Sequence, residues 1–282
     1  MGMSTEGIRI ERLVPQQLDE LILAQNDIFA DYIIPLRSTN QFFLDYLKSV
    51  GGDLTSVLVA LDEKRIVGYV TPVIDGHEMW IGGLGVRPAY RSRGIGTKLL
   101  RAAEEACKKK GVNTVLLEVI EGNDRAQRLY ERLGYKLTKK YITAEGKPCQ
   151  YEGFGKLPKL SSLADMMYMH ERSYSGTCWQ RRKKAALIQS AKGAEGYKVE
   201  GGFVLVRSID TSGFIPFLGV VPEARGRGIG TSLAKFALTR LAEQGAYKVV
   251  LYNLNEDLPT ARMLDKFDFK ITMKQLEMVK II

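Results

Sequence analysis

The sequence contains RSRGIG at residues 91–96 and nearly the same hexapeptide, RGRGIG, at residues 225–230. Each lies in a longer repeat: residues 85–100 read GVRPAYRSRGIGTKLL and residues 219–234 read GVVPEARGRGIGTSLA, with ten of sixteen positions identical and no gap. Two copies at this spacing are too few for a solenoid, which needs three or more short repeats. They indicate two related domains of ordinary size.

Both hexapeptides are expected between an apolar strand and a long helix. In the first half the strand is HEMWIGGLGV, preceded by the hairpin dipeptide Asp75-Gly76, and the helix is TKLLRAAEEACKKKG, with Gly111 as its cap. The other elements expected here are strands in IRIERL, TSVLVALDE, RIVGYVTPVI, TVLLEVI, YKLTKKYIT and CQYEGF, and helices from Pro15, in QFFLDYLKSV and in NDRAQRLYERLG.

The second half repeats this order with fewer residues before its loop. A Gly-, Pro- and Lys-containing stretch, GFGKLPKL at residues 153–160, is the expected boundary, which gives domains 1–155 and 156–282. The elements expected are helices in SSLADMMYMH, CWQRRKKAALIQSA, TSLAKFALTRLAEQG and PTARMLDKF, a hairpin in YKVEGGFVLV, and strands in GFIPFLGV and YKVVLYNL.

A glycine loop that leads into a helix is suited to binding an anion. Its backbone N–H groups and the positive end of the helix dipole point toward one place, and glycine lets a phosphate approach the backbone closely. The sequence does not fit the P-loop, which requires GK[ST] after its last glycine. It also lacks the third glycine of the dinucleotide-binding fingerprint, since Leu99 stands there.

Arg-x-x-Gly-x-Gly after V-x-P, between a strand and a long helix, resembles the acyl-CoA-binding loop of the GCN5-related N-acetyltransferases (GNAT). LEVIEGNDRAQRLYERLGY is similar to the second motif of that family, and the spacing of Glu118, Asn123 and Tyr130 resembles the ribosomal-protein alanine acetyltransferases. The resemblance implies an α/β (α+β) fold with two tandem GNAT-type domains, each a mixed, mostly antiparallel twisted sheet flanked by helices.

The resemblance also implies a set of binding residues for acetyl-CoA, the acyl donor. The loop amides would hold the pyrophosphate, Asn123 would contact the pantetheine arm as well as cap its helix, and Val86 would lie where the strand splays to pair with that arm. Gly82, Gly83 and Gly85 weaken regular pairing there and predict a bulge. The positions implied in the first domain are Leu84, Gly85, Val86, Arg91, Ser92, Arg93, Gly94, Ile95, Gly96, Thr97, Asn123 and Tyr130.

Acetyl transfer to an amine needs a base for the ammonium proton, donors for the developing oxyanion and an acid for the leaving thiolate. Tyr130 is the candidate acid, because a phenol keeps its proton at neutral pH; the alternative is a packing aromatic. Glu118, the only charged residue of TVLLEVI, is the candidate base, and Glu78 is the reserve. Backbone N–H groups of the bulge are the candidate oxyanion donors.

The second domain keeps the loop but not the second motif. The loop residues implied for acetyl-CoA are Val220, Arg225, Gly226, Arg227, Gly228, Ile229, Gly230 and Thr231. In the ungapped frame Tyr252, Asp257, Leu264 and Asp268 stand for Glu118, Asn123, Tyr130 and Gly134, and a one-residue shift would place Asp265 at the tyrosine. Since leucine cannot donate a proton, we expect chemistry in the first domain.

Composition narrows the remaining classes. Residues 1–155 carry 21 Lys and Arg against 20 Asp and Glu, whereas residues 156–282 carry 20 against 12. This asymmetry leaves open an acidic partner, but without a nucleic-acid motif we do not expect nucleic acid. Apolar runs are too short for a membrane span. Residues 1–13 have no basic flank followed by an apolar stretch, so we expect no secretory signal, and three scattered cysteines with two histidines suit the cytoplasm and predict no metal.

The sequence therefore predicts an acetyl-CoA-dependent N-acetyltransferase whose amine acceptor, protein, peptide or small molecule, is not specified. A homodimer is compatible with it. The alternative is a non-catalytic protein that binds CoA or associates with nucleic acid.

Overall fold

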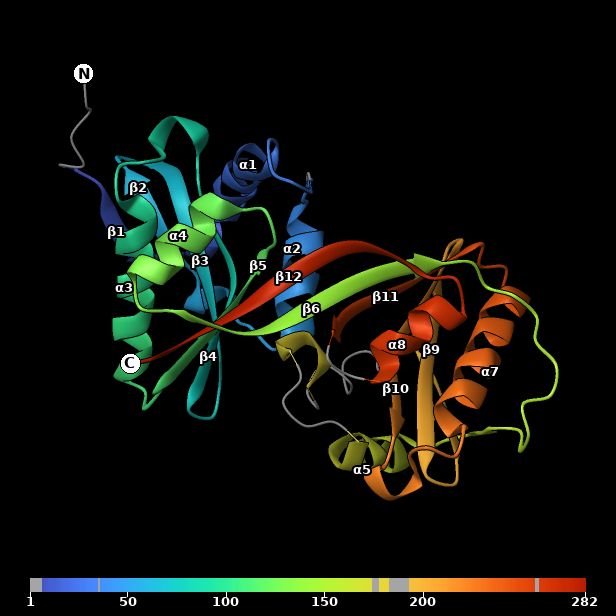
Figure 1. Ribbon diagram of the computed structural model, residues 1–282. Coiled ribbons are helices and arrows are strands. Elements are labelled where there is room, and N and C mark those ends of the chain that lie inside the picture. The colour runs from blue at the N-terminus through green and yellow to red at the C-terminus, as the bar shows by residue number, and fades with distance from the viewer. Residues whose placement is uncertain (1–6, 35, 174–177, 183–192, 257–258) are drawn as a thin grey trace. The chain divides into compact units, whose positions relative to one another are not determined.

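Figure 1 shows the computed structural model, which describes residues 7–34, 36–173, 178–182, 193–256 and 259–282. The chain forms two compact units, Met1–Thr138 together with Leu276–Ile282, and Lys139–Gln275. The expected boundary at residues 153–160 therefore lies inside the second unit. In the described part of the chain, every helix is too short or too polar to span a bilayer.

The first unit follows the predicted order of elements. Its hairpin turn at Asp75-Gly76 has Gly76 at φ +58°, and α3 is followed by Gly111 at φ +83°, as expected for a helix end. Its elements are β1 (Arg9–Arg12), α1 (Leu18–Phe29), α2 (Asn40–Val50), β2 (Leu58–Asp62), β3 (Arg65–Asp75), β4 (Glu78–Val86), α3 (Ile95–Lys108), β5 (Thr114–Ile120) and α4 (Asp124–Arg132), with short 3-10 turns at Pro15–Gln17, Leu54–Ser56 and Pro88–Tyr90.

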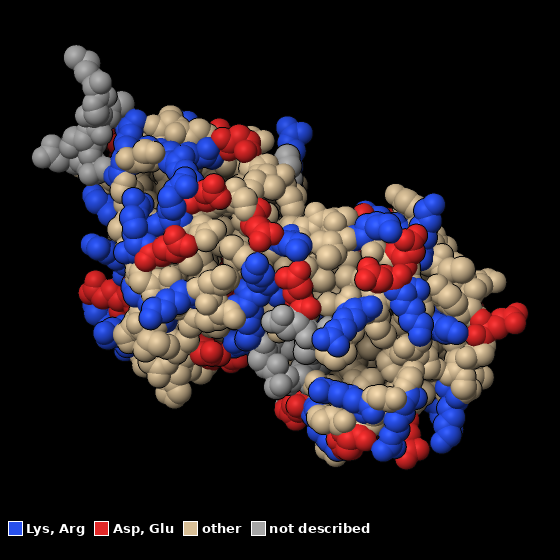
Figure 2. All heavy atoms as spheres, in the orientation of Figure 1, with Lys and Arg blue, Asp and Glu red and all other residues tan. Residues whose placement is uncertain are grey.

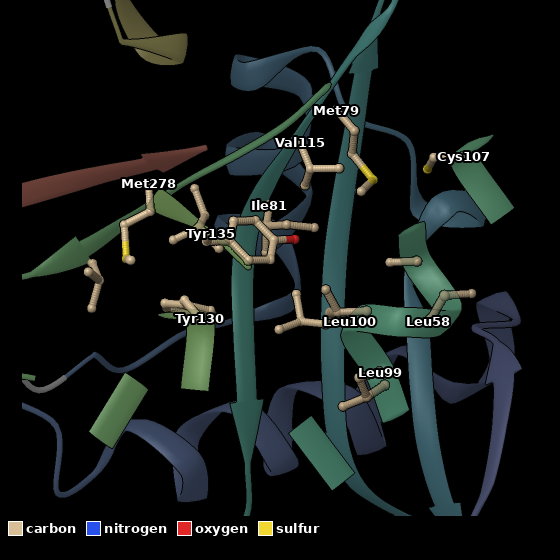
Figure 3. Close-up of a cluster of buried hydrophobic side chains, with 14 of the residues drawn as sticks. Leu58, Met79, Ile81, Leu99, Leu100, Cys107, Val115, Tyr130, Tyr135 and Met278 are labelled. Carbon is tan, nitrogen blue, oxygen red and sulfur yellow. The ribbon is translucent and has the colours of Figure 1, made fainter. Parts of the chain in front are cut away.

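The sheet of the first unit is mixed, with order β1-β2-β3-β4-β5-β12-β6, where β6 is Lys136–Gly146 and β12 is Lys270–Ile281. Among the first five strands, β4 and β5 are the parallel pair. Helices α3 and α4 cover one face, where Leu99, Leu100 and Tyr130 belong to one buried cluster with Ile81 of β4 (Figure 3). Helices α1 and α2 cover the other face. Figure 1 shows α1 and α3 on opposite sides of the strands.

The second unit repeats this plan with sheet order β12-β6-β11-β10-β9-β8-β7, and β10 and β11 as the parallel pair equivalent to β4 and β5. Helices α7 and α8 share one core cluster and α5 belongs to another. Its elements are β7 (Lys159–Leu160), α5 (Leu163–Ser173), a 3-10 turn (Trp179–Arg181), β8 (Glu195–Val199), β9 (Gly202–Ile209), β10 (Ser212–Val220), a 3-10 turn (Pro222–Ala224), α7 (Ile229–Glu243), β11 (Lys248–Asn255) and α8 (Pro259–Lys266).

Two strands, β6 (Lys136–Gly146) and β12 (Lys270–Ile281), contribute residues to both units. The C-terminal end of β12 completes the first core, because Leu276 and Met278 are buried there and Lys280 Nζ lies 2.6 Å from Glu104 Oε2. The end of the chain therefore stabilises the unit in which the chain begins.

Two predicted elements differ from the structure. CQYEGF is not a strand: it follows Pro148, and the Tyr151 N–H donates to Thr239 Oγ1 of α7 at 2.9 Å instead of to a neighbouring strand. Proline cannot donate to a strand ladder, which favours the break. In the stretch expected as a helix from Cys178, Trp179–Arg181 is a 3-10 turn and residues 183–192 lie outside the described residues.

Candidate active site

The first unit opens where β4 and β5 part. The two strands pair from Glu78 opposite Thr114 to Ile81 opposite Leu117, and no further. In the same place β4 bulges against β3, since Val70 faces Leu84 but Pro72 faces Ile81, which leaves one extra residue at Gly82–Gly83. The predicted bulge is confirmed, and it frees backbone groups of β4 at the point of divergence.

The glycine loop joins β4 to α3 beside this opening. Ser92 and Gly94 adopt positive φ, +64° and +78°, and Gly94 is the N-cap of α3. A Cβ at Gly94 would meet no atom within 4 Å, so its surroundings are open. Because the first intrahelical bond of α3 is from the Lys98 N–H to the Gly94 carbonyl, the preceding amides have no intrahelical acceptor. These amides are the backbone donors that the predicted anion site requires, and binding of a phosphate there stays a prediction.

Arg91 has a structural function in this loop. Its Nε donates to the Val86 carbonyl at 3.1 Å, and Nη2 donates to the Ile28 carbonyl at 2.8 Å. Both terminal nitrogens also bind the Asp31 carboxylate, at 2.6 and 2.8 Å. The hydrogen bond from Arg91 lowers the pKa of Asp31. One guanidinium thus ties the loop to the end of β4 and the end of α1.

The other predicted loop residues have varied surroundings. Arg93 donates to the Ala89 carbonyl at 2.6 Å and lies over the Tyr90 ring, and the exposed Ser92 hydroxyl accepts from Arg125 at 3.2 Å. Ile95 is 1% exposed, so only its backbone is available to a ligand. Gly96 and Thr97 are half-buried on the first turn of α3.

The three predicted positions on β4 lie beyond the bulge and are half-buried: Leu84, Gly85 and Val86. Gly85 is required by the helix behind it, because a Cβ there would lie 2.4 Å from Ile28 Cγ2 of α1.

A polar cluster lies on the α1–α2 face of the sheet at the bulge. Glu118 Oε2 accepts a hydrogen bond from Trp80 Nε1 at 2.5 Å, and the Tyr46 hydroxyl donates to the Gly82 carbonyl at 2.6 Å. Burial is the main cause of a raised pKa of Tyr46, and the nearby Tyr69 and Glu118 raise it further by electrostatic repulsion. Glu118, the candidate base, is therefore oriented by an indole and lies near the bulge.

Two polar atoms of this face are buried without a hydrogen-bond partner among the described residues, Gln25 Oε1 and Thr71 Oγ1. Gln25 Nε2 binds the Tyr69 hydroxyl at 2.9 Å. A Cβ added to Gly83 would lie 3.5 Å from that hydroxyl and 3.8 Å from Thr71 Oγ1, so these groups line the bulge. Unpaired buried polar atoms are costly unless a ligand or water pairs with them.

Tyr130 lies on the opposite, α3–α4 face (Figure 3). It is 7% exposed, and its hydroxyl forms no hydrogen bond within the described part of the chain. Burial and the nearby Tyr32 raise its pKa. Asn123 caps α4, accepting from the Ala126 N–H at 3.2 Å, and donates to the Tyr32 hydroxyl at 3.4 Å. The candidate acid and base thus flank the opening from opposite faces.

Glu78, the reserve base, lies at the other end of β4. It is the first residue of the strand, paired with Thr114, four residues before Gly82. At about 3.3 Å per residue, this places its backbone about 13 Å from the bulge.

The second unit repeats the scaffold of this site. β10 and β11 pair only from Ser212 to Phe214, and β10 bulges before Phe217. Gly226 and Gly228 take the positive φ values, +77° and +78°. Arg225 Nε donates to the Val220 carbonyl at 3.1 Å and Nη2 to the Ser173 carbonyl at 3.1 Å, the same clamp as Arg91.

The remaining predicted positions of the second loop follow the first. Arg227 is exposed and Ile229 starts α7. A Cβ at the half-buried Gly230 would lie 3.6 Å from Val220 Cγ2, and Thr231 Oγ1 contacts Met263 Sδ at 3.8 Å.

The backbone fixes the frame that relates the two second motifs. The Tyr135 N–H donates to the Tyr130 carbonyl at 3.0 Å, and the Phe269 N–H donates to the Leu264 carbonyl at 2.8 Å. Leu264 therefore occupies the position of Tyr130, as the ungapped frame predicts. Asp268, at φ +54°, takes the turn position of Gly134. Tyr252 lies on β11, and Asp257 lies outside the described residues.

Several residues of the cluster were not predicted from the sequence. Trp80 and Glu118 could have been linked, because parallel pairing of Trp80 with Leu116 places Glu118 two residues further along the same face. Tyr46, Tyr69 and Gln25 come from α2, β3 and α1, and no local pattern indicates that these elements meet at Gly82–Gly83.

The family comparison agrees with this geometry. The Acetyltransferase (GNAT) family matches the chain twice, over residues 23–135 and 168–269, and the chain belongs to this family. The family implies acetyl transfer from acetyl-CoA to an amine, and the predicted tandem arrangement is confirmed. The finer resemblance to alanine acetyltransferases stays a prediction.

Solved structures share the fold across the whole chain. The GCN5-related N-acetyltransferase from Sphaerobacter thermophilus is 16% identical with a TM-score of 0.77, and the match covers 99% of this chain and 97% of that one. A tandem GNAT protein from the clavulanic acid biosynthesis pathway, solved without AcCoA, is 15% identical with a TM-score of 0.69, covering 97% and 98%. A putative acetyltransferase from Pyrococcus horikoshii is 17% identical with a TM-score of 0.70, covering 100% and 92%.

Proposed function

We propose that the first unit transfers the acetyl group of acetyl-CoA to an amine. The observation that carries this proposal is the meeting of three features at one opening between β4 and β5: the glycine loop at Gly94, the bulge at Gly82–Gly83, and Glu118 with its polar neighbours. The loop amides would bind the pyrophosphate, and β4 from Leu84 to Val86 would pair with the pantetheine arm.

The acceptor amine would enter from the α1–α2 face. An unperturbed lysine-type amine has a pKa of about 10.4, so it must lose a proton before attack. Glu118 would accept that proton, with Trp80 fixing the carboxylate. Gln25 Oε1 and Thr71 Oγ1 offer unpaired acceptor sites beside it, which suits a polar or cationic acceptor.

The amine nitrogen would form the new bond to the carbonyl carbon of the thioester, and the carbon–sulfur bond would break. Backbone N–H groups of the bulge would stabilise the oxyanion. Tyr130 would give its proton to the departing thiolate. The hydroxyl supports this role because, like any phenol, it is protonated at neutral pH, and it pairs with no other described group.

The test is release of CoA thiol from acetyl-CoA with amino acids, polyamines, amino sugars and peptides as acceptors. Glu118→Gln keeps the shape of the side chain but removes the base, and should lower kcat by about 10²–10⁴-fold. Glu78→Gln, on the neighbouring strand β4 and far from the bulge, should leave kcat within twofold. If no acceptor is turned over while CoA still binds, the protein is a non-catalytic CoA-binding protein instead.

The cytoplasm and a soluble amine acceptor fit this proposal, and a homodimer is compatible with it.

Lys and Arg side chains of the second unit are interspersed with acidic ones on the face shown in Figure 2. Several form ion pairs, among them Lys198 with Asp165, Arg240 with Glu195, and Lys248 with Glu145. Paired basic groups do not favour nucleic-acid binding.

A further inference from the structure

Gly83, in the bulge of β4, is a glycine that neither its backbone nor the packing of the described residues requires. Its φ lies outside the left-handed range that favours glycine. A Cβ at Gly82 would lie 2.7 Å from the Trp80 ring, and one at Gly85 would lie 2.4 Å from Ile28, so both of these positions exclude a side chain. A Cβ at Gly83 would make only ordinary contacts, the nearest at 3.5 Å. The place of that Cβ is therefore open space inside the bulge.

The side chains around this space are polar and uncharged. The Tyr69 hydroxyl would lie 3.5 Å, and Thr71 Oγ1 3.8 Å, from a Cβ at Gly83. Thr71 is 1% exposed, and its Oγ1 has no hydrogen-bond partner among the described residues. Gln25 Nε2 donates to the Tyr69 hydroxyl at 2.9 Å, while Gln25 Oε1 is buried and also unpaired within the described part of the chain. Because unpaired buried oxygens are destabilising, these atoms indicate a group that pairs with them when the site is filled.

The second unit fills the same place with hydrocarbon. The register of β9 with β10 repeats that of β3 with β4 at the 134-residue offset of the sequence repeat. The offset replaces each of the three residues around the space by a bulky apolar one: Phe217 for Gly83, Phe203 for Tyr69 and Leu205 for Thr71. These three apolar residues belong to one buried cluster, and Phe217 is 1% exposed. The scaffold thus closes this space where the second motif is lost and leaves it open and polar in the unit that carries Glu118.

The hydrogen-bonding groups around the space select a hydroxyl group as the ligand. The hydroxyls of Thr71 and Tyr69 can each donate and accept, and Gln25 Oε1 only accepts. A ligand hydroxyl also donates and accepts, so it matches this mixture. An ammonium group only donates, and it would be buried here beside uncharged side chains. A methyl group would leave the buried oxygens unpaired.

We propose that the space at Gly83 is a subsite for a hydroxyl group of the acceptor, so that the first unit prefers amino alcohols, amino sugars included, to alkylamines and diamines. The subsite adjoins the candidate base. The Trp80 ring, which binds Glu118, lies against Gly82, and the Tyr46 hydroxyl donates to the Gly82 carbonyl. The amine would meet Glu118 while its hydroxyl lies one residue further along β4. This inference rests on the proposed function for its place in catalysis, but binding of an amino alcohol can be measured without turnover.

The test compares acceptors that differ in one group, by kcat/KM with acetyl-CoA and by Kd in the presence of CoA. One set is ethanolamine, propylamine and ethylenediamine, and the other, one carbon longer, is propanolamine, butylamine and trimethylenediamine. In at least one set we expect the amino alcohol to exceed both analogues about tenfold or more in kcat/KM and in affinity, because the analogues leave buried oxygens unpaired. No preference in either set would overturn the proposal. A preference in Kd without turnover would support it and contradict only the proposed acetyl transfer.

Two variants locate the preference for the amino alcohol over the alkylamine. Gly83→Ala places a methyl group in the space at an ordinary contact distance and should reduce the preference to about threefold or less. Thr71→Val keeps the shape of the side chain but removes the unpaired hydroxyl, so it should reduce the preference about fivefold without lowering the melting temperature. Thr143→Val is the matched control, since Thr143 Oγ1 on β6 is also buried and unpaired among the described residues, and it should keep the wild-type preference. A wild-type preference in both folded variants, Gly83→Ala and Thr71→Val, would overturn the proposal.

Discussion

Arg91 and Arg225 are the most conspicuous residues of the repeated hexapeptide, and sequence reasoning assigns them to the phosphate. The structure gives both a different set of partners. Each guanidinium binds the carbonyl five residues earlier and a carbonyl near the C-terminal end of another helix, α1 for Arg91 and α5 for Arg225. The sequence alone indicates only that each arginine places a positive charge next to the glycine loop. The planar guanidinium lets one arginine bind several carbonyls at once, but the partner carbonyls on α1 and α5 are far away in sequence, so no local pattern indicates them.

Arg91→Lys should therefore be a severe change although it conserves charge. A lysine amine cannot reach Val86, Ile28 and Asp31 together, so the loop loses its anchor. We expect a Kd for acetyl-CoA raised about tenfold, measured by titration. Arg93→Lys, two residues along the loop, is the matched control and should change the Kd less than threefold. Wild-type affinity in Arg91→Lys would mean that Arg91 acts through its charge alone.

Tyr130 supplies a second prediction at the level of the residue. Tyr130→Phe should lower kcat and leave the Kd for acetyl-CoA unchanged, because the hydroxyl acts only on the leaving group. Burial raises the pKa of Tyr130 above its ordinary value near 10, so the protonated, acid form persists at every pH up to 10. We therefore expect no fall of kcat between pH 8 and 9.5. A fall over this range that Tyr130→Phe abolishes would contradict the raised pKa.

At the level of elements, periodicity predicted most of the helices and strands, and the glycines of β4 predicted its bulge. Periodicity could not predict that β12 completes the core of the first unit. β12 has no predicted role because its partners, β5 and β6, belong to residues more than a hundred positions earlier. CQYEGF has the composition of a strand, but it lies along α7: the Tyr151 N–H donates to Thr239, and Lys235 Nζ lies over the Tyr151 ring.

The contribution of β12 to the core of the first unit can be tested at Met278. Met278 is 1% exposed in the core of the first unit, so Met278→Ala should lower the free energy of unfolding by about 2–5 kcal/mol. Amide hydrogen exchange should accelerate in β5, Thr114–Ile120. Ile281→Ala, three residues away and 73% exposed, should change stability by less than about 0.5 kcal/mol. If amide hydrogen exchange accelerated only in β8–β10 of the second unit, the C-terminal strand β12 would stabilise the second unit instead of the first.

For the whole molecule, the two units have the same scaffold and different chemistry. Loop, bulge and clamp occur twice, and one-dimensional comparison of the repeats was enough to predict the unequal second motifs. The polar cluster of the first unit was out of reach, because Gln25, Tyr46 and Tyr69 come from three elements that only the tertiary fold brings to Gly82. On these grounds we propose that the chemistry takes place in the first unit and not in the second.

Two matched glycine variants test this division most directly. Gly94 and Gly228 have the same φ of +78° and equally open surroundings, so a glutamate adds the same backbone strain and the same negative charge at either loop. Alanine at each site controls for the strain alone. We predict that Gly94→Glu abolishes acetyl transfer, whereas Gly228→Glu retains more than half of the wild-type kcat, measured by release of CoA thiol. Loss of activity in Gly228→Glu with activity kept in Gly94→Glu would contradict the assignment of catalysis to the first unit.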